Sequence, residues 1–141
     1  MGDFAGAIED LDAELSGNAG YGPALLVRGL SQGAMGNANA AKADLKAAAE
    51  ALPESGEAQF AYARALIEIG NASRGETVLR RAVALMPEDP APLNSLIRLL
   101  VRQSRREEAQ TLMPRAAELS RMERSAKPGE IRFEGASEAK R

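Results

Sequence analysis

Gly36-Asn37-Ala38, followed by Pro53, recurs 34 residues later as Gly70-Asn71-Ala72, followed by Pro87. Further positions keep this interval and their small side-chain size, among them Ala48, Ala82 and Ala116. A fixed period of this length indicates stacked supersecondary units rather than one globular core. Because such stacks present extended binding surfaces, the period bears on function before any single site is considered.

Each unit contains two segments in which apolar residues recur three and four apart, the spacing of an amphipathic helix. The predicted helices form three pairs: Pro23–Met35 with Asn39–Leu52, Glu57–Ile69 with Ser73–Met86, and Ala91–Gln103 with Arg105–Leu119. Gly36 and Gly70 suit a left-handed C-cap of the first helix, and Pro53 and Pro87 end the second. The sequence therefore predicts antiparallel helix hairpins.

The ends of these segments carry capping signals. Ser55 and Asp89 are good N-caps, and Ser104-Arg105-Arg106-Glu107 has the spacing of a capping box. Pro114 lies inside the last helical segment, where it removes a hydrogen bond to the carbonyl four residues earlier. We therefore expect a bend near Gln110–Met113, or a helix that restarts there.

The pattern resembles the tetratricopeptide repeat (TPR) family, which is built on a 34-residue helix–turn–helix unit. The residues that carry the resemblance are Leu25, Gly29, Gly36, Ala41, Leu45, Ala48 and Pro53 in the first copy, Gln59, Ala63, Gly70, Gly75, Leu79, Ala82 and Pro87 in the second, and Leu93, Ile97, Ser104, Ala109, Met113, Ala116 and Arg121 in the third. Two of these depart from the family pattern, because Ile97 is bulky at a normally small place and Arg121 replaces the final proline. Residues 2–21 match a second helix alone.

The resemblance implies an all-α fold, a right-handed α-solenoid of antiparallel helix hairpins. The predicted repeat domain covers residues 1–123, as a half repeat at 2–21 and full repeats at 22–55, 56–89 and 90–123. Residues 124–141 are predicted to form a C-terminal tail, either disordered or filling a groove in its own molecule or a neighbour. Small residues are required where paired helices cross closely. We therefore expect burial of Gly29, Ala48, Ala63 and Ala82.

Composition limits the classes of function. The 141 residues include no histidine and no cysteine, which removes the commonest general base and all thiol chemistry. The acidic run Glu9–Glu14 reads as the solvated face of an amphipathic helix rather than as a metal or acid–base site. No apolar run approaches the ~20 residues of a membrane span. We predict no enzyme, no cofactor, no metal site and no membrane insertion.

The net charge of −2 hides a gradient along the chain. Residues 1–55 carry eight acidic and three basic side chains, whereas residues 90–141 carry eleven basic and seven acidic ones. Such an array could stack its acidic end on its basic end or attract an acidic partner, although charge for solubility alone would also account for it. The small basic excess has no interleaved aromatic residues, which argues against nucleic-acid binding.

In TPR proteins the first helix of each hairpin lines a concave face where ligands lie. Carried over by equivalent positions, the resemblance implies a partner-binding groove formed by Leu26, Leu30, Phe60, Arg64, Ile67, Asn94, Arg98 and Arg102. The set combines apolar side chains with guanidinium groups, which suits a peptide that carries aliphatic side chains and carboxylates. Some of the apolar members could instead pack between repeats.

The sequence thus predicts a protein–protein interaction module, an adaptor or scaffold, whose partner is a protein or peptide of acidic character. Two alternatives stay open: a regulatory or substrate-docking segment of a larger enzyme, and a module that self-associates through its repeat ends. The N-terminus lacks a signal-peptide pattern, so the default location is cytoplasmic. A periplasmic location stays open if an upstream signal belongs to a longer protein.

Overall fold

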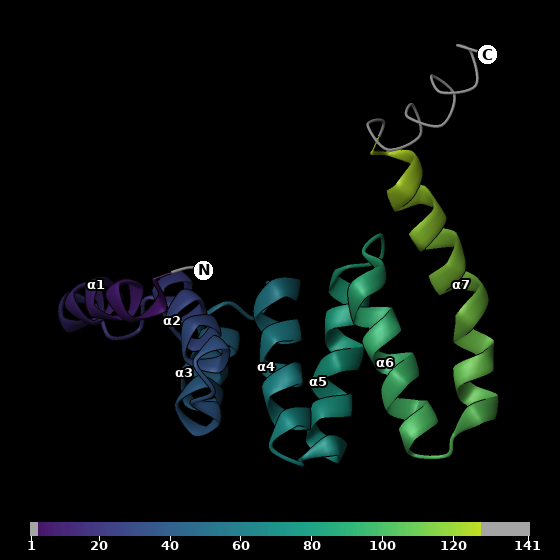
Figure 1. The fold of residues 1–141 in the computed structure, drawn as a ribbon, viewed down its shortest axis with the longest axis horizontal. Helices are drawn as coiled ribbons and strands as arrows, with labels where there is room; N and C mark the ends of the chain where they lie inside the picture. Colours follow the sequence, from purple (N-terminus) through teal and green to yellow (C-terminus); the bar gives the residue numbers. More distant parts are fainter. Residues whose placement is uncertain (1–2, 128–141) are drawn as a thin grey trace, which may run out of the picture. The chain divides into compact units, whose positions relative to one another are not determined.

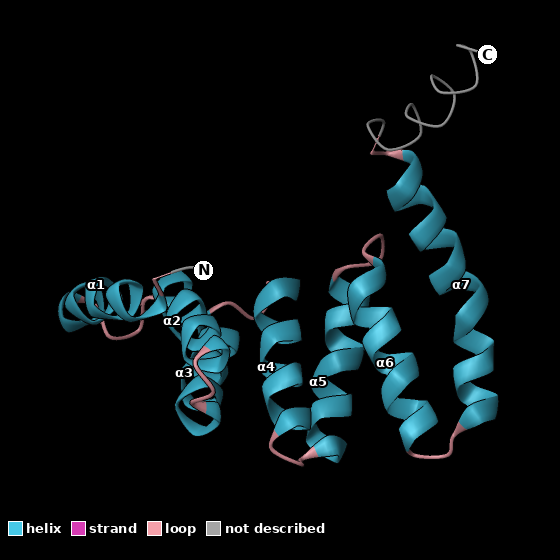
Figure 2. Cartoon of the chain, in the orientation of Figure 1, coloured by secondary structure: helices cyan, strands magenta, loops and turns pink. Residues whose placement is uncertain are grey.

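The computed structural model describes residues 3–127, which form seven α-helices and no strand (Figures 1 and 2). Their bounds are α1 Phe4–Gly17, α2 Gly22–Ala34, α3 Ala38–Ala51, α4 Gly56–Glu68, α5 Ala72–Leu85, α6 Pro90–Arg102 and α7 Arg106–Ser125. Helices α2, α4 and α6 are the first helices of hairpins, and α1, α3, α5 and α7 are second helices. The predicted all-α secondary structure is present throughout the described part of the chain.

The 34-residue period of the sequence is also the period of the backbone. The first helices begin at Gly22, Gly56 and Pro90, and each is one period from the next. The second helices begin at residues 4, 38, 72 and 106, which keep the same interval. Most predicted helices began one residue late, because the helical turn already includes the residue after the N-cap.

The tight turn inside each hairpin uses a left-handed backbone. Gly36 has φ +81° and Gly70 has φ +90°, as expected where a side chain would clash with the backbone. One period later stands Ser104, at φ +62°, a conformation that costs a non-glycine residue energy. The predicted capping box from Ser104 is therefore wrong: Arg105 is the N-cap of α7, and no side chain caps that helix.

Small residues lie where paired helices cross. A Cβ atom added to Gly29 would stand 2.7 Å from the Leu45 side chain, and one added to Gly75 would stand 2.6 Å from Ile67. Gly29 is buried, and the alanines predicted at the crossings are fully buried: Ala48, Ala63 and Ala82. The predicted crossing residues are thereby confirmed.

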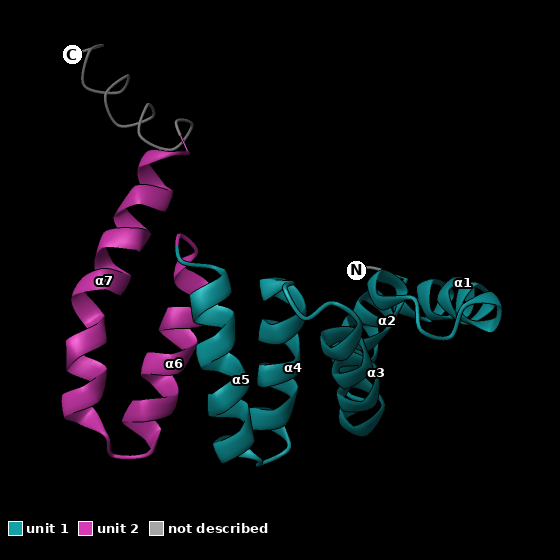
Figure 3. Ribbon diagram, turned by 180° about the vertical axis from the view of Figure 1, so that it is seen from behind, with its two compact units in different colours: residues 1–87 teal, residues 88–141 magenta. Residues whose placement is uncertain are grey.

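The chain divides into two compact units, residues 1–87 and 88–141 (Figure 3). The first contains α1–α5 and a continuous apolar core that runs from Leu15 to Leu66. The second contains the hairpin of α6 and α7, whose most buried side chains include Pro92 and Leu100. The tail predicted from residue 124 begins later, since α7 continues to Ser125, and residues 128–141 lie outside the described part.

Helix α7 is longer than its counterparts because its end lacks their stop signal. Helices α3 and α5 end shortly before Pro53 and Pro87, whereas Arg121 stands in the equivalent place and continues the helix. Pro114 lies inside this continuous helix. The predicted restart near Gln110–Met113 is therefore wrong, and a bend there stays a prediction.

Replacing Pro114 by alanine should stabilise α7. Proline in a helix interior is about 3 kcal/mol less favourable than alanine, and part of that cost is already relieved by local adjustment. We expect the free energy of unfolding to rise by about 1–3 kcal/mol in thermal denaturation followed by circular dichroism. Pro23→Ala is the matched control, because proline in the first helical turn loses no hydrogen bond and its removal should change little. Equal effects of the two substitutions would contradict this account.

Candidate functional site

The first helices of the first unit expose apolar side chains on the positions predicted to bind a partner. Leu30 on α2 is 41% exposed, and Phe60 and Ile67 on α4 are half-buried. Val27, a further α2 residue, is 48% exposed. Helix α2 approaches α4 as well as its own partner α3, so these side chains belong to neighbouring helices. They form an apolar surface with no core behind which to withdraw.

A single arginine accompanies this apolar surface. The guanidinium carbon of Arg64 lies 5.7 Å from the centroid of the Phe60 ring, within the range of a cation–π interaction. Arg64 makes no ion pair with any carboxylate in residues 3–127. Stacking on the ring limits the rotamers of the arginine and leaves its N–H donors available, which preorganises it for a carboxylate.

One predicted member of the surface does not belong to it. Leu26 is only 8% exposed and is part of the core of the first unit. Its counterpart one period later, Phe60, is half-buried and retains an accessible ring. The interpretation of Leu26 as a binding residue is therefore corrected to a packing role, because α2 turns this position toward the core.

The second unit carries the remaining predicted residues on α6. Arg98 and Arg102 are exposed and Asn94 is half-buried. The only hydrogen bond from the Arg98 side chain to a described residue goes to the Ser95 hydroxyl oxygen, at 2.9 Å. Neither arginine pairs with a carboxylate among the described residues. Arg98 and Arg102 lie one helical turn apart, on the same side of α6.

An ionic cluster that the sequence analysis missed ties three helices of the first unit together. Arg28 on α2 donates from Nε and Nη2 to the two carboxylate oxygens of Asp44 on α3, both at 2.7 Å. Its Nη1 donates to Asp12 on α1 at 2.8 Å. The pKa of Arg28 is raised above its ordinary value, chiefly by the hydrogen bonds to Asp44, against an opposing effect of desolvation, and also by Asp12.

The sequence does contain a signal for this cluster. One period after Arg28 and Asp44 the chain has Tyr62 and Val78, so two charged residues occupy places that are apolar in the next repeat. Asp44 is also nearly buried, at 9% exposure. A bidentate guanidinium–carboxylate pair satisfies such a charge and fixes the geometry of the hairpin. We assign this cluster a structural role.

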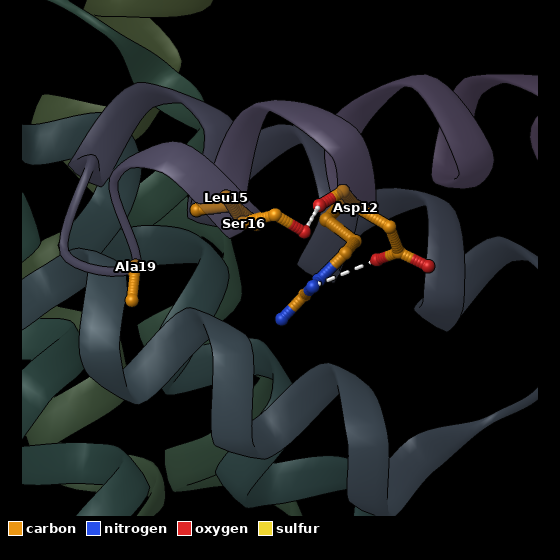
Figure 4. Close-up of a pocket in the computed structure, with 5 residues that line it drawn as sticks. Asp12, Leu15, Ser16 and Ala19 are labelled. Carbon is orange, nitrogen blue, oxygen red and sulfur yellow. Dashed lines mark hydrogen bonds and ion pairs between the residues drawn. The ribbon is translucent and has the colours of Figure 1, made fainter.

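A shallow cleft borders the cluster. Its volume is about 340 Å³, and it is lined by Asp12, Leu15, Ser16, Ala19 and Arg28. Figure 4 shows Asp12 and Ser16 on the same side of α1, where the Ser16 hydroxyl donates to the Asp12 backbone carbonyl at 2.8 Å. Arg28 already bonds both nearby carboxylates, so the cleft offers no unpaired buried charge to a ligand.

Two further searches covered residues 3–127 only. Within that range, no three His, Cys, Asp or Glu side chains are arranged to hold a metal ion. Within the same range, every helix is too short or too polar to cross a membrane.

Comparison with known proteins identifies the repeat. Residues 34–91 match the model of the tetratricopeptide repeat family. A search of curated proteins found no match.

Solved structures extend the similarity to most of the chain. A MamA RS-1 double mutant has a TM-score of 0.80 at 21% identity, over 86% of this chain and 68% of that one. A MamA fragment from Desulfovibrio magneticus RS-1 has a TM-score of 0.78 at 22% identity, over 85% and 68%. A further MamA crystal structure has a TM-score of 0.78 at 24% identity, over 92% and 72%. At these identities the likeness establishes the fold. The chain is built of tetratricopeptide repeats, folded as the all-α solenoid of antiparallel hairpins that its sequence predicted.

Proposed function

We propose that this chain is a protein-interaction module that binds a peptide or partner protein on the exposed surfaces of its first helices. One observation carries the proposal. The first helices present apolar side chains beside arginines that have no carboxylate partner among the described residues, although the chain holds more acidic than basic residues. A cation left without an available counterion is open to an external one.

The chemistry of the surface favours an acidic partner with apolar side chains. Leu30, Phe60 and Ile67 offer apolar area in the first unit, and burial of such area is the main source of binding free energy. Arg64 beside them adds a charge-assisted hydrogen bond to a carboxylate. In the second unit, Arg98 and Arg102 offer the same chemistry with Asn94 as a neutral hydrogen-bonding group. We assign the chain a scaffold or adaptor role and no catalytic step.

Reversing the charge of Arg64 should remove partner binding without loss of fold. Partners are first captured from a native extract on the immobilised chain, and binding of the identified partner is then titrated against each variant. A charge-assisted hydrogen bond contributes about 1.5–3 kcal/mol, so Arg64→Glu should raise the Kd at least about tenfold. Arg98→Glu applies the same test to the second unit.

Matched controls carry the same change of charge on second helices. Lys46→Glu alters an exposed residue of α3, and Arg106→Glu alters an exposed residue at the start of α7. Both should retain the wild-type Kd, and all four variants should keep the helical circular dichroism of the wild type. If the first-helix variants bind as tightly as these controls, the partner uses another surface and the proposal fails.

A further inference from the structure

The repeat supplies an internal reference for the face of α1 that a first helix would cover. In the first full hairpin, Ala41, Leu45 and Ala48 are buried against α2, at 3%, 4% and 0% exposure. One period earlier on α1 stand Ala7 and Leu11, both half-buried, and Glu14, which is exposed. Phe4, one turn before Ala7, is 41% exposed. In the described residues, no helix precedes α1, so this face has no partner.

Glu14 shows that the missing partner is not another TPR first helix. Its counterparts Ala48, Ala82 and Ala116 are small because a first helix crosses closely at that place. A glutamate there would hold two helix axes apart. The face of α1 therefore fits a surface that brings positive charge to Glu14 rather than a close helix crossing.

The charge of α1 is entirely of one sign. Between Phe4 and Gly17 the helix contains four acidic residues and no basic residue. Asp12 is paired with Arg28, whereas Glu9, Asp10 and Glu14 form no ion pair with any described residue. Asp10 and Glu14 lie one turn apart on the open face, on either side of Leu11. The face of Phe4, Ala7, Asp10, Leu11 and Glu14, here called the acidic face, is thus both apolar and negatively charged.

At the other end of the described chain, α7 has an open face of opposite charge. Ala117 is exposed, although its counterpart Ala49 in α3 is only 6% exposed, and Met113 is 43% exposed. Arg121 and Arg124 follow Met113 and Ala117 at intervals of four and three residues, which places all four on one side of the helix. We call these four residues the basic face.

The two arginines of the basic face are unpaired within the described residues. The acidic residues near them, Glu118 and Glu123, are engaged with Arg115 at 3.0 Å and Lys127 at 3.7 Å. Arg121 and Arg124 form no ion pair with any residue of 3–127. The basic face therefore combines small apolar groups with two free cations, which complements the acidic face in both respects.

We propose that copies of this chain associate head to tail, with the acidic face of one copy docked on the basic face of α7 of the next. The occupant of each face is thus a second copy of the same chain. Because the two faces differ, the contact is heterologous, and each added copy leaves one face of each kind open. The product is an open chain that grows with protein concentration, and its electrostatic part weakens in high salt.

The test uses the full chain and two double variants. Asp10→Arg with Glu14→Arg makes the acidic face positive, and Arg121→Glu with Arg124→Glu makes the basic face negative. Each variant alone then places like charges in contact and should remain monomeric. Mixed together, the variants restore opposite charges at both kinds of contact and should assemble again. Mass is measured by sedimentation velocity and light scattering over a range of protein and salt concentrations.

The expected result is a wild-type mass that rises without a plateau at low salt and falls at high salt, loss of assembly in each variant, and its return in the mixture. Circular dichroism of each variant confirms that the helices are retained. Arg64→Glu should assemble as the wild type does, which separates this proposal from the binding surface of the first helices. A wild-type monomer at every concentration, a dimer that stops growing, single variants that assemble normally, or a mixture that stays monomeric would each overturn the proposal.

Discussion

Replacing Asp44 by alanine is expected to lower the free energy of unfolding by about 2–3 kcal/mol. Removing one partner of a buried ion pair typically costs about 3–5 kcal/mol, because the other charge is left desolvated. Here the Arg28 side chain is 24% exposed and keeps its bond to Asp12, so the loss is smaller. Denaturation in urea, followed by circular dichroism, measures the change.

The repeat supplies both a control and a rescue. Asp10→Ala changes the counterpart of Asp44 one period earlier, an exposed residue without an ion pair, and should alter stability by less than about 0.5 kcal/mol. The double substitution Arg28→Tyr with Asp44→Val installs the residues of the next repeat at these places and should recover most of the loss, since apolar packing can replace an ion pair. If Asp44→Ala and Asp10→Ala are equally mild, the ionic cluster does not contribute to stability.

Ala82→Leu should destabilise the second full hairpin by about 1–3 kcal/mol, because three added carbon atoms have no space at a helix crossing. Ala82 is fully buried on α5, whereas Ala84 on the same helix is exposed. Ala84→Leu is therefore the matched control, with the same change of residue and nearly the same helix propensity. The midpoint and slope of urea denaturation give the free energy for each variant. A melting curve of Ala82→Leu that coincides with that of Ala84→Leu would contradict the assigned crossing.

Among the predicted binding residues, exposure followed the repeat only in part. The positions of Leu30, Arg64 and Arg98 are one period apart, and all three are exposed. Leu26 and Phe60 are also one period apart, yet the first is in the core and the second is partly accessible. Helical spacing identifies the side of a helix, but the width of the buried stripe depends on the neighbouring helices.

The sequence by itself determined the helix pairs, their 34-residue spacing and the small residues at the crossings, because these depend on local backbone preferences and on side-chain size repeated at a fixed interval. Only the tertiary structure showed that Asp12, Arg28 and Asp44 meet, since they lie on three different helices and share neither the helical nor the repeat interval. Tertiary structure also decided that α7 passes through Pro114 without a restart. A lost hydrogen bond is a local cost, and the helix continues where packing of residues such as Ala116 and Leu119 outweighs it.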